Sequence, residues 1–138
     1  MSKRMMATLT AEHLVVLEMA DKLRDNLEKL KTDQDFGAVQ DGLMEFSTLL
    51  EHTVNQHFLQ EDEELFPKMV KSHPELRNEV KGLQQEHQEI AYSHNSLRQE
   101  LLGQEPSLEA VIALGGALAD QLDLHLRREH EILANKKR

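Results

Sequence analysis

The stretch HFLQEDEELFP, residues 57–67, carries the pattern from which the fold follows. His57 and Glu61 are four positions apart, and residues at that spacing lie one turn apart on the same face of an α-helix. Large apolar side chains flank the pair, namely Phe58, Leu65 and Phe66. The stretch therefore predicts a helix whose inner face turns an imidazole and a carboxylate toward one point.

A second stretch, HLRREHEIL, begins at residue 125 and repeats this arrangement. Alignment of the two stretches pairs His57 with His125 and Glu61 with Glu129. A single pair of this kind is usually a surface contact worth about 0.2–0.5 kcal/mol. Because the chain builds the same turn twice, we interpret both pairs as parts of one buried site.

Two further histidines, His13 and His87, extend the repeat. Each follows a glutamate, Glu12 or Glu86, and each lies in a stripe of apolar residues at steps of three and four. The first half of the chain thus supplies one histidine and then a His-x-x-x-Glu, and the second half does the same. This order predicts two related helix pairs.

Four segments show the three-and-four periodicity of an amphipathic helix. They cover about residues 8–30, 36–70 and 74–102, and a final segment that follows a cap at Ser107. The first helix is expected to start at Thr8 or Thr10, the second at Asp35 and the third at Pro74. Pro67 is expected to kink or end the second helix.

Long helices joined by short loops predict an all-α fold, an up-down-up-down antiparallel four-helix bundle. We expect one domain over residues 1–138, made of the helix pairs 8–71 and 74–134. In such a bundle, four inward histidines and two inward glutamates meet in one layer.

Composition excludes several classes of function. The 138 residues carry a formal charge of −9, which disfavours binding to nucleic acid or to anionic lipid. The chain has no cysteine, so thiolate metal sites, disulfides and a cysteine nucleophile are excluded. No signal peptide and no membrane span are predicted, and we expect a cytoplasmic protein.

The inward histidines and glutamates predict a metal centre. Buried carboxylates are costly unless they are paired or bind a metal. Imidazole with carboxylate suits iron, zinc, nickel or manganese, and two metals fit better than one because central glutamates can bridge them. The predicted metal ligands are His13, His57, Glu61, His87, His125 and Glu129.

The remaining histidines are not predicted to bind metal. His130 is the ambiguous one, because it lies five residues after His125, but the repeat favours Glu129. His94 is expected to be at most an outer group, and His52 and His73 to lie off the site. The expected apolar lining of the site is Val16, Leu17, Val54, Ile90, Ala91, Leu122 and Ile132, with Tyr92 pointing away.

These motifs resemble the hemerythrin-like family, the HHE cation-binding domain. The resemblance covers nearly the whole chain, and HF-x-x-E followed by LFP is its most specific part. It implies two iron ions with a bridging oxygen species. His13 and His57 would bind one iron, His87 and His125 the other, and Glu61 and Glu129 would bridge them.

Two positions depart from the pattern of oxygen-carrying hemerythrins. Those proteins have a second histidine where this chain has Ala91, and an aspartate where it has His130. The chain therefore resembles the broader branch with four histidines and two glutamates, for which reversible oxygen carriage is not implied. The ferritin-like class is disfavoured, since the sequence contains no Glu-x-x-His.

The leading hypothesis for function is a non-haem di-iron protein that binds or senses O2 or a related small ligand, such as NO or peroxide. One alternative is a di-iron enzyme acting on peroxide or NO. Others are an iron-storage or iron-sensing module and a metal-free interaction bundle. No catalytic base or nucleophile is apparent beyond the ligands. Zinc or another divalent metal in place of iron remains an alternative. A redox or signalling partner is expected, but the sequence does not identify it.

Overall fold

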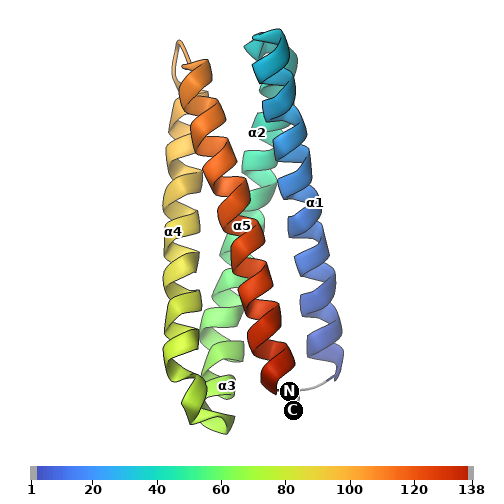
Figure 1. Ribbon diagram of the computed structural model, residues 1–138, viewed down its shortest axis with the longest axis vertical. Helices are drawn as coiled ribbons and strands as arrows, with labels where there is room; N and C mark the ends of the chain where they lie inside the picture. The colour runs from blue at the N-terminus through green and yellow to red at the C-terminus, as the bar shows by residue number, and fades with distance from the viewer. Residues whose placement is uncertain (1–2, 137–138) are drawn as a thin grey trace.

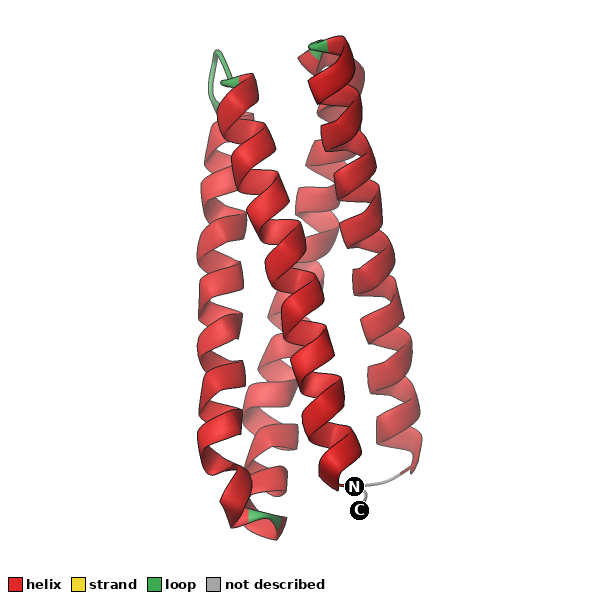
Figure 2. Cartoon of the chain, viewed as in Figure 1, coloured by secondary structure: helices red, strands yellow, loops and turns green. Residues whose placement is uncertain are grey.

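The computed structural model describes residues 3–136, with side chains described for residues 11–53 and 55–134. The α-helices are α1 (Lys3–Asp33), α2 (Phe36–Thr53), α3 (Phe66–Ser72), α4 (Arg77–Leu102) and α5 (Leu108–Lys136). Two π-helical turns, η1 (Val54–Phe58) and η2 (Glu61–Leu65), lie between α2 and α3, and a 3₁₀ turn, η3 (Pro74–Leu76), precedes α4. No strand occurs within the described range (Figure 2).

The helices form four antiparallel rods, because α2, η1, η2 and α3 follow one another as a single helical path (Figure 1). In that view α1 runs upward, the α2–α3 rod downward, α4 upward and α5 downward. α1 packs against α2 and α5, and α4 packs against α5 and the α2–α3 rod. The predicted all-α, up-down-up-down four-helix bundle is therefore confirmed.

The later helix starts follow the expected chemistry. The Ser107 hydroxyl accepts a hydrogen bond from the Ala110 N–H at 3.2 Å, and its carbonyl accepts one from the Val111 N–H at 2.9 Å. Pro74 is in the first turn of η3, where its missing N–H costs no helical hydrogen bond. Asp35 directly precedes α2.

The first helix begins earlier than predicted. α1 starts at Lys3, so Thr8 and Thr10 lie inside the helix and the prediction that one of them caps its start is wrong. The stretch KRMMA that precedes Thr8 consists of residues with good intrinsic helix propensity. The apolar periodicity, which begins later, marks where the helix is buried and not where it begins.

Pro67 does not end the second rod. The backbone stays helical to Ser72, and Pro67 lies in the first turn of α3. Just before it, the Phe66 N–H donates to the Glu61 carbonyl, five residues back instead of four. This wider turn gives the proline ring the space that a regular α-turn denies it.

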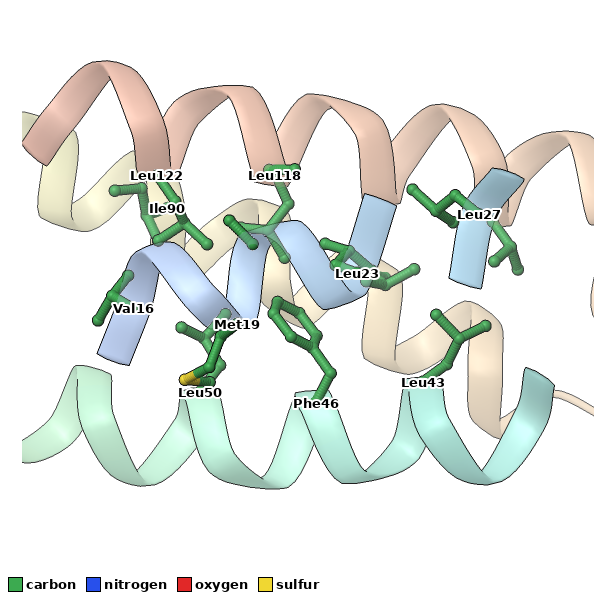
Figure 3. Packing of buried hydrophobic residues seen from close by; sticks show 14 of the residues in the cluster. Val16, Met19, Leu23, Leu27, Leu43, Phe46, Leu50, Ile90, Leu118 and Leu122 are labelled. Carbon is green, nitrogen blue, oxygen red and sulfur yellow. The ribbon is translucent and has the colours of Figure 1, made fainter. Parts of the chain in front are cut away.

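Buried apolar residues form two separate clusters along the bundle. The larger cluster fills the half nearer the α1–α2 and α4–α5 loops, and Figure 3 shows α1, α2, α4 and α5 side chains interlocking there, among them Leu23, Phe46, Ile90 and Leu118. The smaller cluster fills the α3 end, with members Leu65, Phe66, Met69, Val80, Leu83 and Leu133. Between these clusters lies a layer of buried polar side chains.

A pair of adjacent glycines in α5 tests the packing of the larger cluster. A Cβ at Gly115 would lie 2.9 Å from Leu27 Cδ1, whereas a Cβ at Gly116 would meet no atom within 4 Å. Gly115→Ala should therefore cost about 1–3 kcal/mol of overpacking, while Gly116→Ala should stabilise by about 0.5–1 kcal/mol through helix propensity. Urea unfolding of both variants measures the difference, and equal effects would contradict this close α1–α5 contact.

Candidate metal centre

The polar layer brings together the six side chains that the sequence singles out. His13 comes from α1, His57 from η1, Glu61 from η2, His87 from α4, and His125 and Glu129 from α5. None of the six is more than 4% exposed. We refer to these residues as the six-residue cluster.

The six-residue cluster consists of two overlapping groups of possible metal ligands. One is His13, His57, Glu61 and Glu129, and the other is Glu61, His87, His125 and Glu129. Within each group the ligand atoms all lie within 4.8 Å of one another. Both glutamates belong to both groups, so the layer offers two adjacent positions for a cation with two carboxylates between them.

The distances show how the carboxylates span the two groups. Glu61 Oε1 lies 3.4 Å from His57 Nε2 and 3.1 Å from His87 Nε2, which belong to different groups. Glu129 Oε1 lies 3.4 Å from His13 Nε2, and Glu129 Oε2 lies 3.5 Å from His125 Nε2. The four histidines thus turn their Nε2 atoms inward, toward shared carboxylates.

Most of the inward atoms of the layer lack protein hydrogen-bond partners, and the other two, Nε2 of His87 and Nε2 of His125, lie 3.0 Å from each other. Among the described side chains, the buried nitrogen and oxygen atoms without a partner are Gln121 Oε1 and otherwise only atoms of the six-residue cluster: Nε2 of His13 and His57 and both oxygens of Glu61 and Glu129. Buried polar groups are normally satisfied, because an unsatisfied one costs about 1–3 kcal/mol. A concentration of such atoms at one point fits a bound cation.

The outer nitrogens of the same histidines are hydrogen-bonded. His57 Nδ1 bonds to Glu12, His125 Nδ1 to Glu86 Oε1 at 2.8 Å, and His87 Nδ1 to Asp62 Oδ1 at 2.9 Å. His13 Nδ1 lies 3.2 Å from His130 Nε2. A histidine that binds metal through one nitrogen usually donates from the other to such a partner, which fixes the ring and raises its basicity.

Comparison with known families agrees with this geometry. A model described as the hemerythrin HHE cation-binding domain matches residues 4–136. The chain belongs to the hemerythrin HHE cation-binding domain family. Searches of curated proteins and of solved structures gave no match. The two buried groups of histidine and glutamate in this HHE domain therefore fit a metal site.

The helices of this HHE domain were also compared with the requirements of a membrane span. Within residues 3–136, none combines the length and apolar character needed to cross a bilayer.

Burial controls the ionisation of the layer. Burial, together with the adjacent Glu129, raises the pKa of Glu61 to about 12. Burial also opposes ionisation of Glu129, but contacts with Glu61 and His13 outweigh it and lower the pKa of Glu129 to about 2. Burial lowers the pKa of His87 to about 3 and that of His125 to about 4. These histidines are therefore neutral at pH 7, which is the form that binds metal.

These shifts predict a stability maximum for the metal-free HHE domain near pH 6.5. Below that pH, unfolding lets His57, His87 and His125 take up protons that the folded state refuses, so stability falls as the pH drops. Above it, unfolding releases the proton that folding retains on Glu61, so stability falls as the pH rises. Each group contributes a slope of up to about 1.4 kcal/mol per pH unit.

Urea midpoints between pH 4 and 9, measured in the presence of a chelator, test this bell shape. Glu61→Gln should remove the alkaline limb and leave the acid limb, because the amide does not titrate. A flat profile in the native chain would contradict the proposed burial of neutral histidines.

The other histidines lie outside the layer. Glu129 faces the centre, whereas His130 is exposed and lies against the outer nitrogen of His13. His94 is buried in the larger apolar cluster's half of the bundle and bonds to Ser47 Oγ at 2.9 Å, so its partner is not one of the six. His52 is exposed, and His73 in the α3–η3 turn pairs with Glu75.

The predicted apolar lining is confirmed only in part. Val16, Ile90 and Leu122 are buried in the larger cluster, and Leu17 and Ile132 are half-buried against the apolar clusters. Ala91 is exposed, so its prediction is wrong: the buried stripe of α4 runs through His87, Ile90 and His94, and Ala91 lies beside that stripe. The side chain of Val54 lies outside the described residues, and Tyr92 points to solvent at 75% exposure, as expected.

Sequence reasoning missed the aromatic walls and the outer hydrogen-bond partners. The Phe58 ring stacks on His87 with centroids 3.9 Å apart, and Phe66 lies on the same imidazole at 5.6 Å. The alignment of Glu12 with Glu86 was a usable signal, since each bonds to the histidine of the next rod. Asp62 gave no such signal, because the residue aligned with it in the second half of the chain is His130, which is not an acid.

Proposed function

We propose that this HHE domain is a non-haem di-iron protein of the cytoplasm that binds or senses O2 or a related small ligand such as NO. The observation that carries the proposal is the pair of ligand groups that share Glu61 and Glu129, with most of their inward atoms unpartnered. One cation would satisfy only one group, whereas two cations satisfy both. His13 and His57 would hold one ion, His87 and His125 the other, and the two glutamates would bridge.

The donor set favours iron over zinc. Imidazole and carboxylate without thiolate suits iron, and combinations of histidine with carboxylate that leave positions open are typical of non-haem iron sites. Four protein ligands per ion would complete the tetrahedron that zinc prefers, but would leave open positions on iron. When bound, two irons would supply two electrons to a small ligand.

The surrounding residues support binding of a small, weakly polar molecule. Phe58 and Phe66, which are 4% and 0% exposed, cover the His87 side of the layer. Val16, Ile90 and Leu122 close the layer toward the larger cluster. These apolar walls exclude bulk water, which favours a small, weakly polar ligand.

Elemental analysis of protein purified without an affinity tag is the direct test. We expect about two irons per chain, and far fewer in His125→Ala, while the exposed His52→Ala control retains them. Anaerobic reduction followed by O2 or NO should then change the absorption spectrum in proportion to the iron content. One metal per chain, or zinc in place of iron, would overturn the di-iron proposal.

The same preparation separates binding from turnover. An enzyme acting on peroxide or NO would consume either one catalytically, whereas a binding protein would titrate to a fixed endpoint. We expect a fixed endpoint, because every side chain of the two ligand groups is proposed to hold an ion and the clusters on either side of the layer are apolar. An iron-storage role would require uptake well beyond two irons per chain.

A further inference from the structure

The hydrogen bonds to the outer nitrogens of the four inward histidines follow the internal repeat of the sequence, with one exception. Glu12 bonds to His57 as Glu86 bonds to His125. In the alignment of HFLQEDEELF with HLRREHEILA, Asp62 corresponds to His130. Asp62 bonds to His87, and His130 takes the matching place on His13.

This exception gives one inward histidine a different kind of outer partner. Three of the four can donate from Nδ1 to a carboxylate, whereas His13 Nδ1 has a ring nitrogen of His130 as its partner. A carboxylate fixes the ring more firmly and donates more charge through it, and loss of such a partner typically weakens metal binding by about 10–100-fold. His13 should therefore be the weakest of the four histidine ligands.

A second, independent feature distinguishes the same side of the layer. A surface cavity of about 140 Å³ is lined by Glu12, Val15, His52, Thr53, Gln56 and His57. It reaches the outer face of His57, which belongs to the same ligand group as His13. On the other side, Phe58 and Phe66 both stack on His87, and Phe58 also packs edge-on against His125 at 5.3 Å. Phe58 lies farther from His57, at 5.8 Å and without stacking on it.

We propose that the two metal positions are held unequally, and that His130 is the positioning residue that makes the His13–His57 position the one that exchanges its ion. This inference rests on the proposed function, since it requires two bound ions. The His87–His125 position is the permanent one, with two carboxylate partners and two aromatic walls. The His13–His57 position is the labile one, beside a cavity and with an imidazole in place of one carboxylate partner.

The test is the release of ferrous iron to a chromogenic chelator from the fully loaded protein, without oxygen and at one pH. We expect two phases of one ion each, with rates at least about tenfold apart. His130→Asp restores the carboxylate and should slow the fast phase about tenfold without changing the slow one. Asp62→His replaces the carboxylate partner of His87 by an imidazole, so it should speed the slow phase, which belongs to the His87–His125 position.

Two controls separate hydrogen bonding from charge and from folding. His130→Asn keeps a neutral acceptor and should leave the fast phase unchanged, whereas a purely structural role of His130 would move both variants alike. His73→Asp makes the same change of residue type in the α3–η3 turn, away from the layer, and should alter neither phase. Circular dichroism of each variant checks that the bundle is folded.

The outcomes distinguish this inference from the function on which it rests. Two ions that leave at one rate, or a His130→Asp variant that changes both phases equally, overturn the unequal positions while leaving the di-iron proposal in place. A folded chain that takes up one ion or none overturns both.

Discussion

Replacing Glu61 and Glu129 together by glutamine is expected to raise the melting temperature of the metal-free protein and to abolish its binding of metal. Both carboxylates are 0% exposed, and none of their oxygens has a hydrogen-bond partner. Burial, together with the adjacent Glu129, raises the pKa of Glu61 to about 12. A glutamine at position 61 removes the cost of keeping the Glu61 carboxyl protonated at neutral pH, which is about 1.4 kcal/mol for each pH unit above the usual pKa of a carboxyl group.

Thermal unfolding in the presence of a chelator measures this gain, which should amount to roughly 5–10 °C. The matched control replaces Glu63 and Glu131 by glutamine, since these exposed residues lie two positions after the buried pair. The control should keep both its metal content and its melting temperature. A buried-pair variant that unfolds earlier than the native chain would show that the two glutamates serve the fold and not a metal.

Withdrawing metal from the loaded native protein should have the largest effect in the opposite direction. A ligand that binds only the folded state stabilises it by RT ln(1 + [L]/Kd), about 4 kcal/mol when its concentration is 1,000 times Kd. The unfolded chain cannot gather six ligands from four rods, so this condition is met. For a domain of 138 residues the melting temperature should fall by roughly 10–20 °C.

Calorimetry of the same sample before and after chelation gives the value directly. The Glu61→Gln, Glu129→Gln double variant is the control, because its melting temperature should not respond to chelation. A native protein whose melting temperature is unchanged by chelation would contradict a metal held between the four rods.

The arrangement of the six-residue cluster could be predicted because it depends on spacing alone. His57 with Glu61, and His125 with Glu129, are one turn apart on any helix, and the antiparallel bundle brings the two turns to one level. The apolar stripes that contain His13 and His87 fix the direction of those side chains. Local rules and one simple topology were therefore sufficient.

The features that escaped prediction depend on how the rods are rotated and on local winding. Ala91 lies four residues after His87 but faces solvent, because the packing of α4 selects the stripe through Ile90 and His94 as the buried one. The contact of Asp62 with His87 joins two rods whose relative rotation no single-helix pattern gives. The π-turns η1 and η2 arise around the centre itself, which is where such turns often occur in functional helices.

The division of the apolar core by a polar layer has a consequence for cooperativity. The smaller cluster, around Phe66 and Met69, touches the larger one only across the layer of histidines and glutamates. Without a cation, the layer holds the two halves of the bundle together only weakly. The α3 end can then open while the other half of the bundle stays folded. With cations in place, all four rods share ligands at one level, and the bundle opens as a single unit. Metal occupancy would thus determine whether amide hydrogens at the α3 end exchange through local fluctuation or only through global unfolding.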